Sequence, residues 1–177
     1  MFIGDSISTG LSLYGFLDKE NVFAQQGLAP STALDAEIDG VTLSDKIASF
    51  KPKKVFIMLG TNSVGYADNE TLAASMKELV DKIAGLTKSK IYVISIPPVT
   101  AEAEASDENA LTLKNITDYN TKLKTVIAGS SATFIDLNSV LSGSDGYFDA
   151  DYAEMDGIHF MGTTYEVMLS YLQKQSS

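Results

Sequence analysis

Cysteine, tryptophan and arginine are all missing from this 177-residue chain, and histidine occurs once. Without cysteine, the chain cannot form a disulfide, a Cys-zinc site or a thiol nucleophile. Without arginine, it lacks the bidentate clamp for phosphate, because all 13 basic residues are lysines. The single histidine, His159, excludes a multi-histidine metal site, so any imidazole chemistry must use this residue.

The chain also lacks a positive charge balance and any long apolar run. Its formal net charge of −10 repels nucleic acid and anionic membranes, and it also keeps a protein in solution. Both interpretations point to a neutral or cationic partner. No apolar stretch approaches the ~20 residues that span a bilayer, so no transmembrane segment is predicted.

The length and composition predict one domain over residues 1–177. Hydrophobic residues make up 45% of the chain and charged residues 20%, which is typical of a globular protein with a substantial core. No internal repeat and no linker interrupts the pattern.

Five short β-rich runs alternate with longer helical patterns. Lys54–Leu59 and Ile91–Ile96 are nearly continuous apolar runs, typical of strands buried on both faces in a parallel sheet. Pro97 and Pro98 end the second of these, because proline cannot donate to a ladder. The other predicted strands are Met1–Ile3, Val22–Gln26 and Thr133–Leu137.

Apolar residues at steps of three and four predict the helices between these strands. A helix capped by Asp68 or Asn69 runs to Leu86, and others cover Leu43–Phe50, residues 111–127 and Thr163–Gln175. Strands alternating with helices imply a doubly wound α/β sandwich. In such sheets the functional crevice lies outside the carboxyl ends of the strands.

Polar residues and glycines follow the first three strands at that edge. The first strand ends at Gly-Asp-Ser with Ser6, the second at Gly27, and the third at Gly-Thr-Asn with Asn62. The stretch Asp-Gly-Ile-His, from Asp156 to His159, lies beyond the fifth strand. We expect all of these to converge on one rim.

These residue types suit nucleophilic catalysis on an ester. A serine hydroxyl needs an adjacent base, commonly histidine, and a carboxylate commonly orients the imidazole. Asp156 stands three residues before His159, so one turn can place it against Nδ1 and leave Nε2 facing Ser6. The backbone amides of Ser6 and Gly27 and the side chain of Asn62 are candidate oxyanion donors, each typically worth ~10²–10³ in rate.

Each motif alone has an ordinary explanation as a turn or a helix cap, but the ordered set resembles the SGNH, or GDSL-type, hydrolase family. "FIGDSIS" carries Ser6, "FAQQGL" carries Gly27, "LGTNS" carries Asn62, and "DGIH" carries Asp156 and His159. The resemblance implies a flavodoxin-like α/β/α sandwich with a five-stranded parallel sheet, and a serine esterase without metal or cofactor. One departure is Ser63, where the family often has aspartate.

The resemblance further implies a short-chain acyl esterase, acting on acetyl groups of a carbohydrate or similar alcohol. Lysophospholipase, thioesterase and acyltransferase activities of the same fold remain open, as does a non-catalytic carbohydrate-binding module. Similar proteins are often exported from bacteria or held at the cell surface, so we expect an extracellular or surface location, with the cytoplasm as the alternative. The oligomeric state is left open.

Residues beside these motifs have further predicted roles. Val64, Gly65 and Tyr66 follow Asn62 and are expected to line the substrate pocket, with packing as an equal alternative for Tyr66. Met155 and Phe160 flank the Asp-x-x-His turn and are expected in the core.

The remaining carboxylates near the motifs are predicted to be structural. Asp5 is expected to hydrogen-bond the backbone around the nucleophile turn, with a catalytic role as the less favoured alternative. An acidic loop has some character of a cation site, but its spacing does not match an EF-hand, so a solvated loop is favoured. Its carboxylates are Asp145, Asp149, Asp151 and Glu154.

Overall fold

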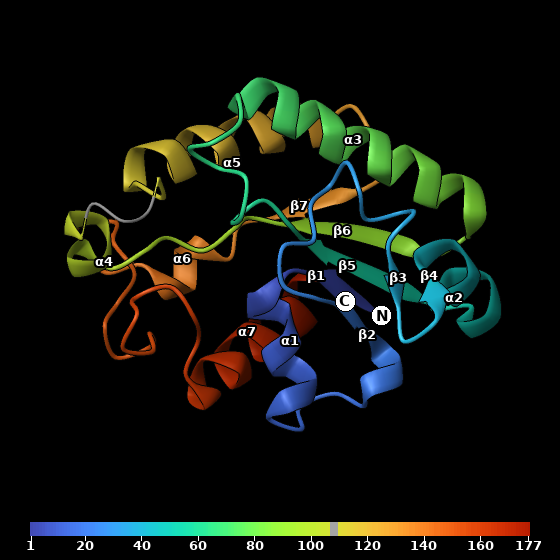
Figure 1. The fold of residues 1–177 in the computed structure, drawn as a ribbon, viewed down its shortest axis with the longest axis horizontal. Helices are drawn as coiled ribbons and strands as arrows, with labels where there is room; N and C mark the ends of the chain where they lie inside the picture. The colour runs from blue at the N-terminus through green and yellow to red at the C-terminus, as the bar shows by residue number, and fades with distance from the viewer. Residues whose placement is uncertain (107–109) are drawn as a thin grey trace.

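Five parallel strands form the central sheet in the computed structural model, which describes residues 1–106 and 110–177 (Figure 1). The spatial order is β2-β1-β5-β6-β7. When only the strands of this sheet are counted along the chain, this is the 2-1-3-4-5 order of flavodoxin-like sheets. The crevice of such a sheet lies where the strand order reverses, here beside β1. The strands are β1 (Phe2–Gly4), β2 (Val22–Ala24), β5 (Lys54–Met58), β6 (Lys90–Ile94) and β7 (Thr133–Ile135).

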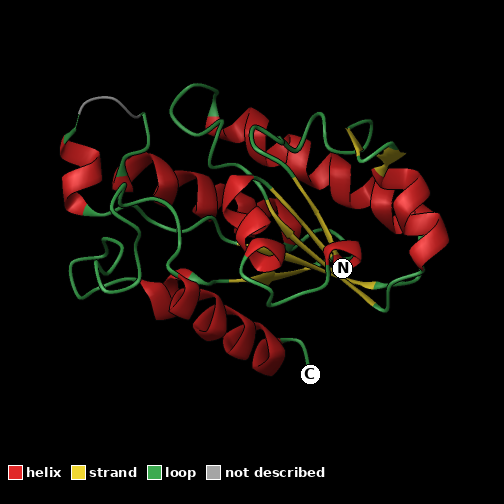
Figure 2. Cartoon of the chain, turned by 60° about the horizontal axis from the view of Figure 1, so that its bottom comes forward, coloured by secondary structure: helices red, strands yellow, loops and turns green. Residues whose placement is uncertain are grey.

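Helices cover both faces of this sheet, as the two cartoon views show (Figures 1 and 2). Side chains alternate across each strand: Ile3 and Ile57 face one cluster, and Phe2 and Met58 face the other. The first cluster packs against α2 (Leu43–Phe50), α3 (Asn69–Leu86) and α5 (Leu113–Ile127). The second packs against α1 (Ser6–Leu13), α6 (Asn138–Leu141) and α7 (Gly162–Gln175).

The predicted three-layer α/β/α architecture is therefore confirmed, and most boundaries agree within two residues. The helix over Leu43–Phe50 has its predicted ends, and it stops at Lys51, which adopts a left-handed φ of 48°. The cap of α3 is Asp68, whose Oδ2 accepts the amide of Thr71 at 2.8 Å.

The structure also contains short elements that the sequence patterns did not predict. A hairpin joins β3 (Glu37–Ile38) to β4 (Val41–Thr42), and its turn residues Asp39 and Gly40 both have positive φ. The others are a 3-10 turn η1 (Lys19–Asn21), α4 (Ala101–Ala105) and α6.

Within the two described ranges, no helix combines the length and apolar character needed to cross a membrane.

Candidate active site

The turn between β1 and α1 presents Ser6 at the carboxyl edge of the sheet. Asp5 caps the helix, with Oδ1 accepting the amide of Ile7 at 3.2 Å. A side chain at Gly4 would lie 1.9 Å from Oγ of Ser8 and 3.0 Å from the carbonyl oxygen of Met58. The Gly-Asp-Ser order thus combines a residue without a side chain, a capping carboxylate and an accessible hydroxyl.

A second turn carries Asp156 and His159. Oδ1 of Asp156 accepts the backbone amides of Ile158 and His159, each at 2.9 Å, and Oδ2 lies 2.6 Å from Nδ1 of His159. Partial burial acts to raise the pKa of Asp156. The amide and ring of His159 and the amide of Ile158 outweigh it and hold the pKa below its ordinary value. The carboxylate is therefore ionised at neutral pH.

The two turns meet through one hydrogen bond. Nε2 of His159 lies 3.0 Å from Oγ of Ser6, although 153 positions separate the two residues in the chain. Hydroxyl, imidazole and carboxylate thus form a continuous chain, with the histidine and aspartate side chains partly open to solvent.

The hairpin around His159 is anchored in the core. The amide of Glu154 donates to the carbonyl of His159 at 2.8 Å, and Ala153 and Phe160 form an antiparallel bridge. Phe160 is fully buried, with its ring centroid 5.4 Å from that of Tyr165. The buried packing of Phe160, the residue after His159, therefore fixes the position of the imidazole.

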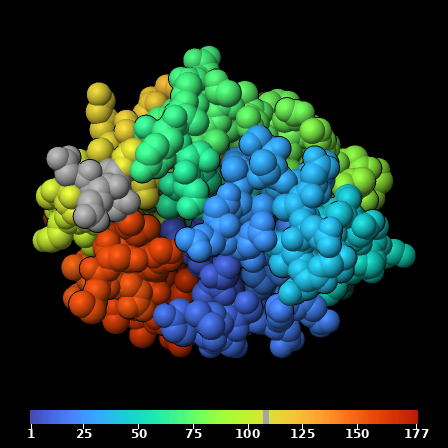
Figure 3. Space-filling view, in the orientation of Figure 1, coloured from blue at the N-terminus to red at the C-terminus, as the bar shows by residue number. Residues whose placement is uncertain are grey.

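The loops carrying Gly27 and Asn62 lie on either side of the Ser6 turn, because β2 and β5 both pair with β1. Gly27 has a φ of 78°, which favours glycine, and nothing lies within 4 Å of a Cβ placed there. Asn62 is exposed. Figure 3 shows the start of the chain, in dark blue, between the green segment after β5 and the orange-red segment before α7.

The chain was compared with known families and structures. The model of the GDSL-like Lipase/Acylhydrolase family matches residues 2–167. The chain belongs to this family. It is accordingly an ester-hydrolysing enzyme, and a serine nucleophile in a catalytic triad is typical of its members.

Solved structures share the fold of this GDSL hydrolase at low sequence identity. A GDSL-like lipase from Bacteroides thetaiotaomicron has a TM-score of 0.76 and 17% identity, over 98% of this chain and 85% of that one. A lipase/acylhydrolase from Enterococcus faecalis has a TM-score of 0.68 and 17% identity, over 98% of this chain and 93% of that one. A variant of a Geobacillus acetyl-xylooligosaccharide esterase has a TM-score of 0.65 and 18% identity, over 98% of this chain and 91% of that one. No curated protein matches the chain.

The predicted pocket residues of the GDSL hydrolase do not share one environment. Val64 is fully buried in the core, so the prediction that its side chain lines the pocket is wrong. Gly65 approaches the backbone of Ala110 closely, since a side chain there would lie 2.2 Å from its carbonyl oxygen. Tyr66 is exposed on the surface, and its contact with substrate remains a prediction.

The two apolar residues beside the Asp-x-x-His turn also differ. Phe160 lies in the core as expected. Met155 is fully exposed, so its predicted burial is wrong. The turn that aims Asp156 at His159 directs the preceding side chain to solvent.

The acidic loop uses its carboxylates in local turns. Asp145 accepts the amide of Tyr147 at 3.1 Å, and Asp149 accepts that of Asp151 at 3.0 Å. In the part of the chain that the structure describes, no three histidine, aspartate or glutamate side chains gather as a metal site.

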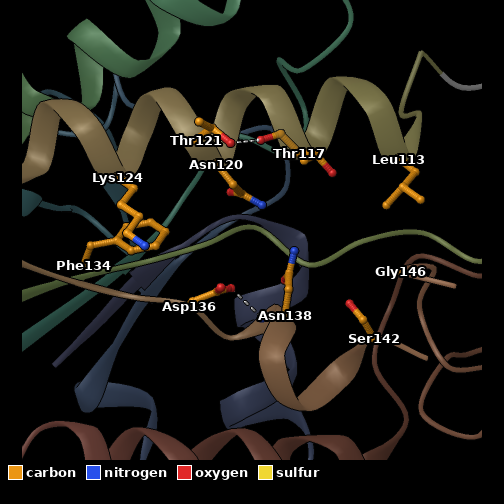
Figure 4. A pocket seen from close by; sticks show the side chains of 10 residues that line it. All are labelled: Leu113, Thr117, Asn120, Thr121, Lys124, Phe134, Asp136, Asn138, Ser142 and Gly146. Atoms are coloured by element: carbon orange, nitrogen blue, oxygen red, sulfur yellow. Dashed lines mark hydrogen bonds between the residues drawn. The ribbon is translucent and has the colours of Figure 1, made fainter. Parts of the chain in front are cut away.

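A groove of about 380 Å³ lies between α5 and the segment from β7 to Gly146 (Figure 4). Asn120 forms part of its wall, held by two hydrogen bonds to the backbone of Ile96. None of Ser6, His159 and Asp156 lines this groove, so it is distinct from the site described above.

One buried polar residue beside the site was missed from the sequence. Thr61 precedes Asn62, and its side chain is buried without a hydrogen-bond partner among the described residues. Asp5 is 1% exposed and accepts the Ile7 amide, in agreement with its predicted structural role.

Proposed function

We propose that this enzyme is a serine esterase that uses Ser6, His159 and Asp156 as its catalytic triad. Its preferred substrates are short-chain acyl esters, acetyl esters above all, of a carbohydrate or similar alcohol. The observation that carries the proposal is the chain of hydrogen bonds from Ser6 through His159 to Asp156, at 3.0 and 2.6 Å.

This geometry supports a two-step reaction through an acyl-enzyme. Nε2 of His159 takes the proton of Ser6 as Oγ attacks the ester carbonyl, and Asp156 stabilises the imidazolium through Nδ1. The imidazolium then protonates the leaving alcohol as the carbon–oxygen bond breaks. A water molecule, deprotonated by His159, hydrolyses the acyl-enzyme and regenerates the hydroxyl of Ser6.

Three donors are assigned to the oxyanion of the tetrahedral intermediate. Ser6 is the first residue of α1, where backbone amides have no partner within the helix and the helix dipole favours negative charge. The amide of Gly27 and the side chain of Asn62 approach from the loops on either side. Such donors stabilise the transition state more than the ground state, which is what accelerates the reaction.

The proposed substrate class rests on charge and on likeness of fold. A net charge of −10 and the absence of arginine disfavour anionic alcohols such as phosphorylated sugars, and favour a neutral one. The Geobacillus protein that shares the fold is an acetyl-xylooligosaccharide esterase. An acetylated neutral saccharide fits both observations.

Hydrolysis of a p-nitrophenyl ester series from acetate to decanoate tests the proposal. Wild type is compared with Ser6→Ala. Ser12→Ala is the matched control, because among the described residues its hydroxyl bonds only to the carbonyl of Thr9 in α1. We expect activity highest on acetate, lost in Ser6→Ala and retained in Ser12→Ala. Full activity in a folded Ser6→Ala protein would overturn the triad.

The substrate class needs its own readout. Release of acetate from acetylated xylooligosaccharide, with products identified by mass spectrometry, separates hydrolysis from transfer to a sugar acceptor. A steep preference for acyl chains beyond about eight carbons would contradict the short-acyl assignment, because each buried CH₂ contributes ~0.8 kcal/mol in an apolar tunnel.

A further inference from the structure

Asp5 is an incompletely satisfied carboxylate directly before the proposed nucleophile. It is 1% exposed, and only Oδ1 has a partner, the amide of Ile7. Oδ2 is buried and has no hydrogen bond among the described residues. Since unpaired buried carboxylate oxygens are costly, this one needs an explanation.

Thr61, in the turn that follows the neighbouring strand β5, also has a buried oxygen that is unpaired among the described residues. It is 8% exposed, it precedes Asn62, and its Oγ1 also has no hydrogen-bond partner in the described ranges. Because Gly4 of β1 pairs with Met58 of β5, the segments that follow these two strands leave the sheet side by side. The hydroxyl of Thr61 acts to lower the pKa of Asp5, which places this hydroxyl beside the carboxylate.

The charge of Asp5 also interacts with ionisable groups around the site. Burial raises its pKa to about 6, while the Ile7 amide, the Thr61 hydroxyl and the charge on His159 act in the opposite direction. Burial is the largest cause of the raised pKa values of Tyr119 and Tyr165, and the negative charge of Asp5 adds to both. Asp5 is therefore ionised above about pH 6, and its charge is felt by His159.

We propose that Asp5 and Thr61 form a positioning pair for the proposed reaction. The carboxylate of Asp5, held by the hydroxyl of Thr61, supplies a second negative charge that stabilises the imidazolium of His159. The same contact ties the turn of Ser6 to the turn of Asn62. This inference rests on the proposed function, because it assigns a role to groups behind the same triad.

The pair acts through its neighbours and exchanges no proton with the substrate. When Ser6 loses its proton, His159 becomes cationic, and a buried carboxylate nearby lowers the free energy of that state. Its effect is larger in the transition state than in the ground state, so it raises kcat more than it changes KM. Protonation of Asp5 at lower pH removes the effect.

Three variants separate this role from a structural one. Asp5→Asn keeps an acceptor for Ile7 and a partner for Thr61 but removes the charge. Thr61→Val removes the hydroxyl at constant shape, and Thr61→Ser keeps the hydroxyl as the conservative control. For each variant, kcat and KM for p-nitrophenyl acetate are measured from about pH 5 to 9, a range that includes the raised pKa of Asp5. Thermal unfolding first verifies the fold of each variant.

We expect Asp5→Asn to lower kcat about tenfold or more at pH 8, with little change in KM and with one ionisation missing from the acid side of the profile. In Thr61→Val the acid limb moves to higher pH, because one of the groups that lower the pKa of Asp5 is gone. Thr61→Ser keeps the wild-type profile.

Other outcomes would overturn the inference. A folded Asp5→Asn protein with wild-type kcat and an unchanged acid limb excludes the electrostatic role. An unmoved acid limb in Thr61→Val excludes the pairing. Full activity in Ser6→Ala, measured in parallel, would instead remove the proposed triad, so the two failures are distinguishable.

Discussion

The carboxylate of Asp156 contacts both the backbone and the ring of His159. Its Oδ1 accepts the amide of His159, and its Oδ2 lies 2.6 Å from Nδ1 of the ring. Three residues of chain are enough to make both contacts. The orientation of the imidazole is therefore built into a local turn, and Phe160 only has to place that turn against the sheet.

Replacing the Asp156 carboxylate by an amide tests this arrangement. Asp156→Asn keeps one acceptor oxygen but can present an NH₂ group to Nδ1, which favours the wrong tautomer. We predict a fall in kcat of about 10³-fold or more on p-nitrophenyl acetate. Asp149→Asn is the control and should retain activity, because its Oδ1 accepts the Asp151 amide in a separate local turn. A loss below tenfold would argue against an orienting role.

Asn62 is predicted to matter for activity and not for stability. It is exposed, and no hydrogen bond of its side chain is seen in the described ranges. Asn62→Ala should lower kcat by ~10²–10³, as expected for one oxyanion donor, with a change in unfolding free energy within about 0.5 kcal/mol. Ser63→Ala is the neighbouring control. Wild-type kcat in Asn62→Ala would remove it from the oxyanion site.

Asp5→Asn should make stability less dependent on pH. The folded pKa of Asp5 is raised from 3.8 to about 6 by burial, so the folded state binds more protons than the unfolded state between these values. Stability linked to Asp5 is thus present below pH 3.8 and is lost as pH rises through 6, by roughly 3 kcal/mol at most. Urea unfolding at pH 4 and 8 measures this. A wild-type and a variant curve with the same pH slope would contradict it.

Gly4 and Gly85 offer a matched pair for the packing of the nucleophile turn. A side chain at Gly4 meets Ser8 and the backbone of Met58, whereas nothing lies within 4 Å of one at Gly85 in α3. Gly4→Ala should lower the unfolding free energy by about 1–3 kcal/mol, and Gly85→Ala should raise it by about 0.5–1 kcal/mol. Equal effects of the two substitutions in urea unfolding would show that the Gly4 turn is not tightly packed.

The layers of the fold were predictable because burial determines the pattern of the sequence. Lys54–Met58 and Lys90–Ile94 lie in the middle of the sheet, where both faces are covered, and their apolar runs reflect this. The β3–β4 hairpin was missed, although Asp39-Gly40 is the residue pair that two-residue hairpin turns favour. Its strands have only two residues each, too few to show an alternating pattern.

The site was predictable where its contacts are local or follow from strand order. Asp156 and His159 lie within one turn, and Ser6 stands at the end of a strand that the topology places centrally. Exposure was not predictable from residue type, as Met155 on the surface shows. The position of Thr61 beside Asp5 depends on how two loops leave neighbouring strands, and no spacing in the sequence records it.

The formation of the acyl-enzyme on Ser6 is the most direct test of the proposed chemistry. The protein is mixed with p-nitrophenyl acetate, quenched in acid during turnover, and analysed by intact mass spectrometry and peptide mapping. We predict one added acetyl group on the peptide that contains Ser6, and no addition in Ser6→Ala. Acetylation of a different residue, or full turnover by Ser6→Ala, would contradict the assignment of Ser6 as the nucleophile.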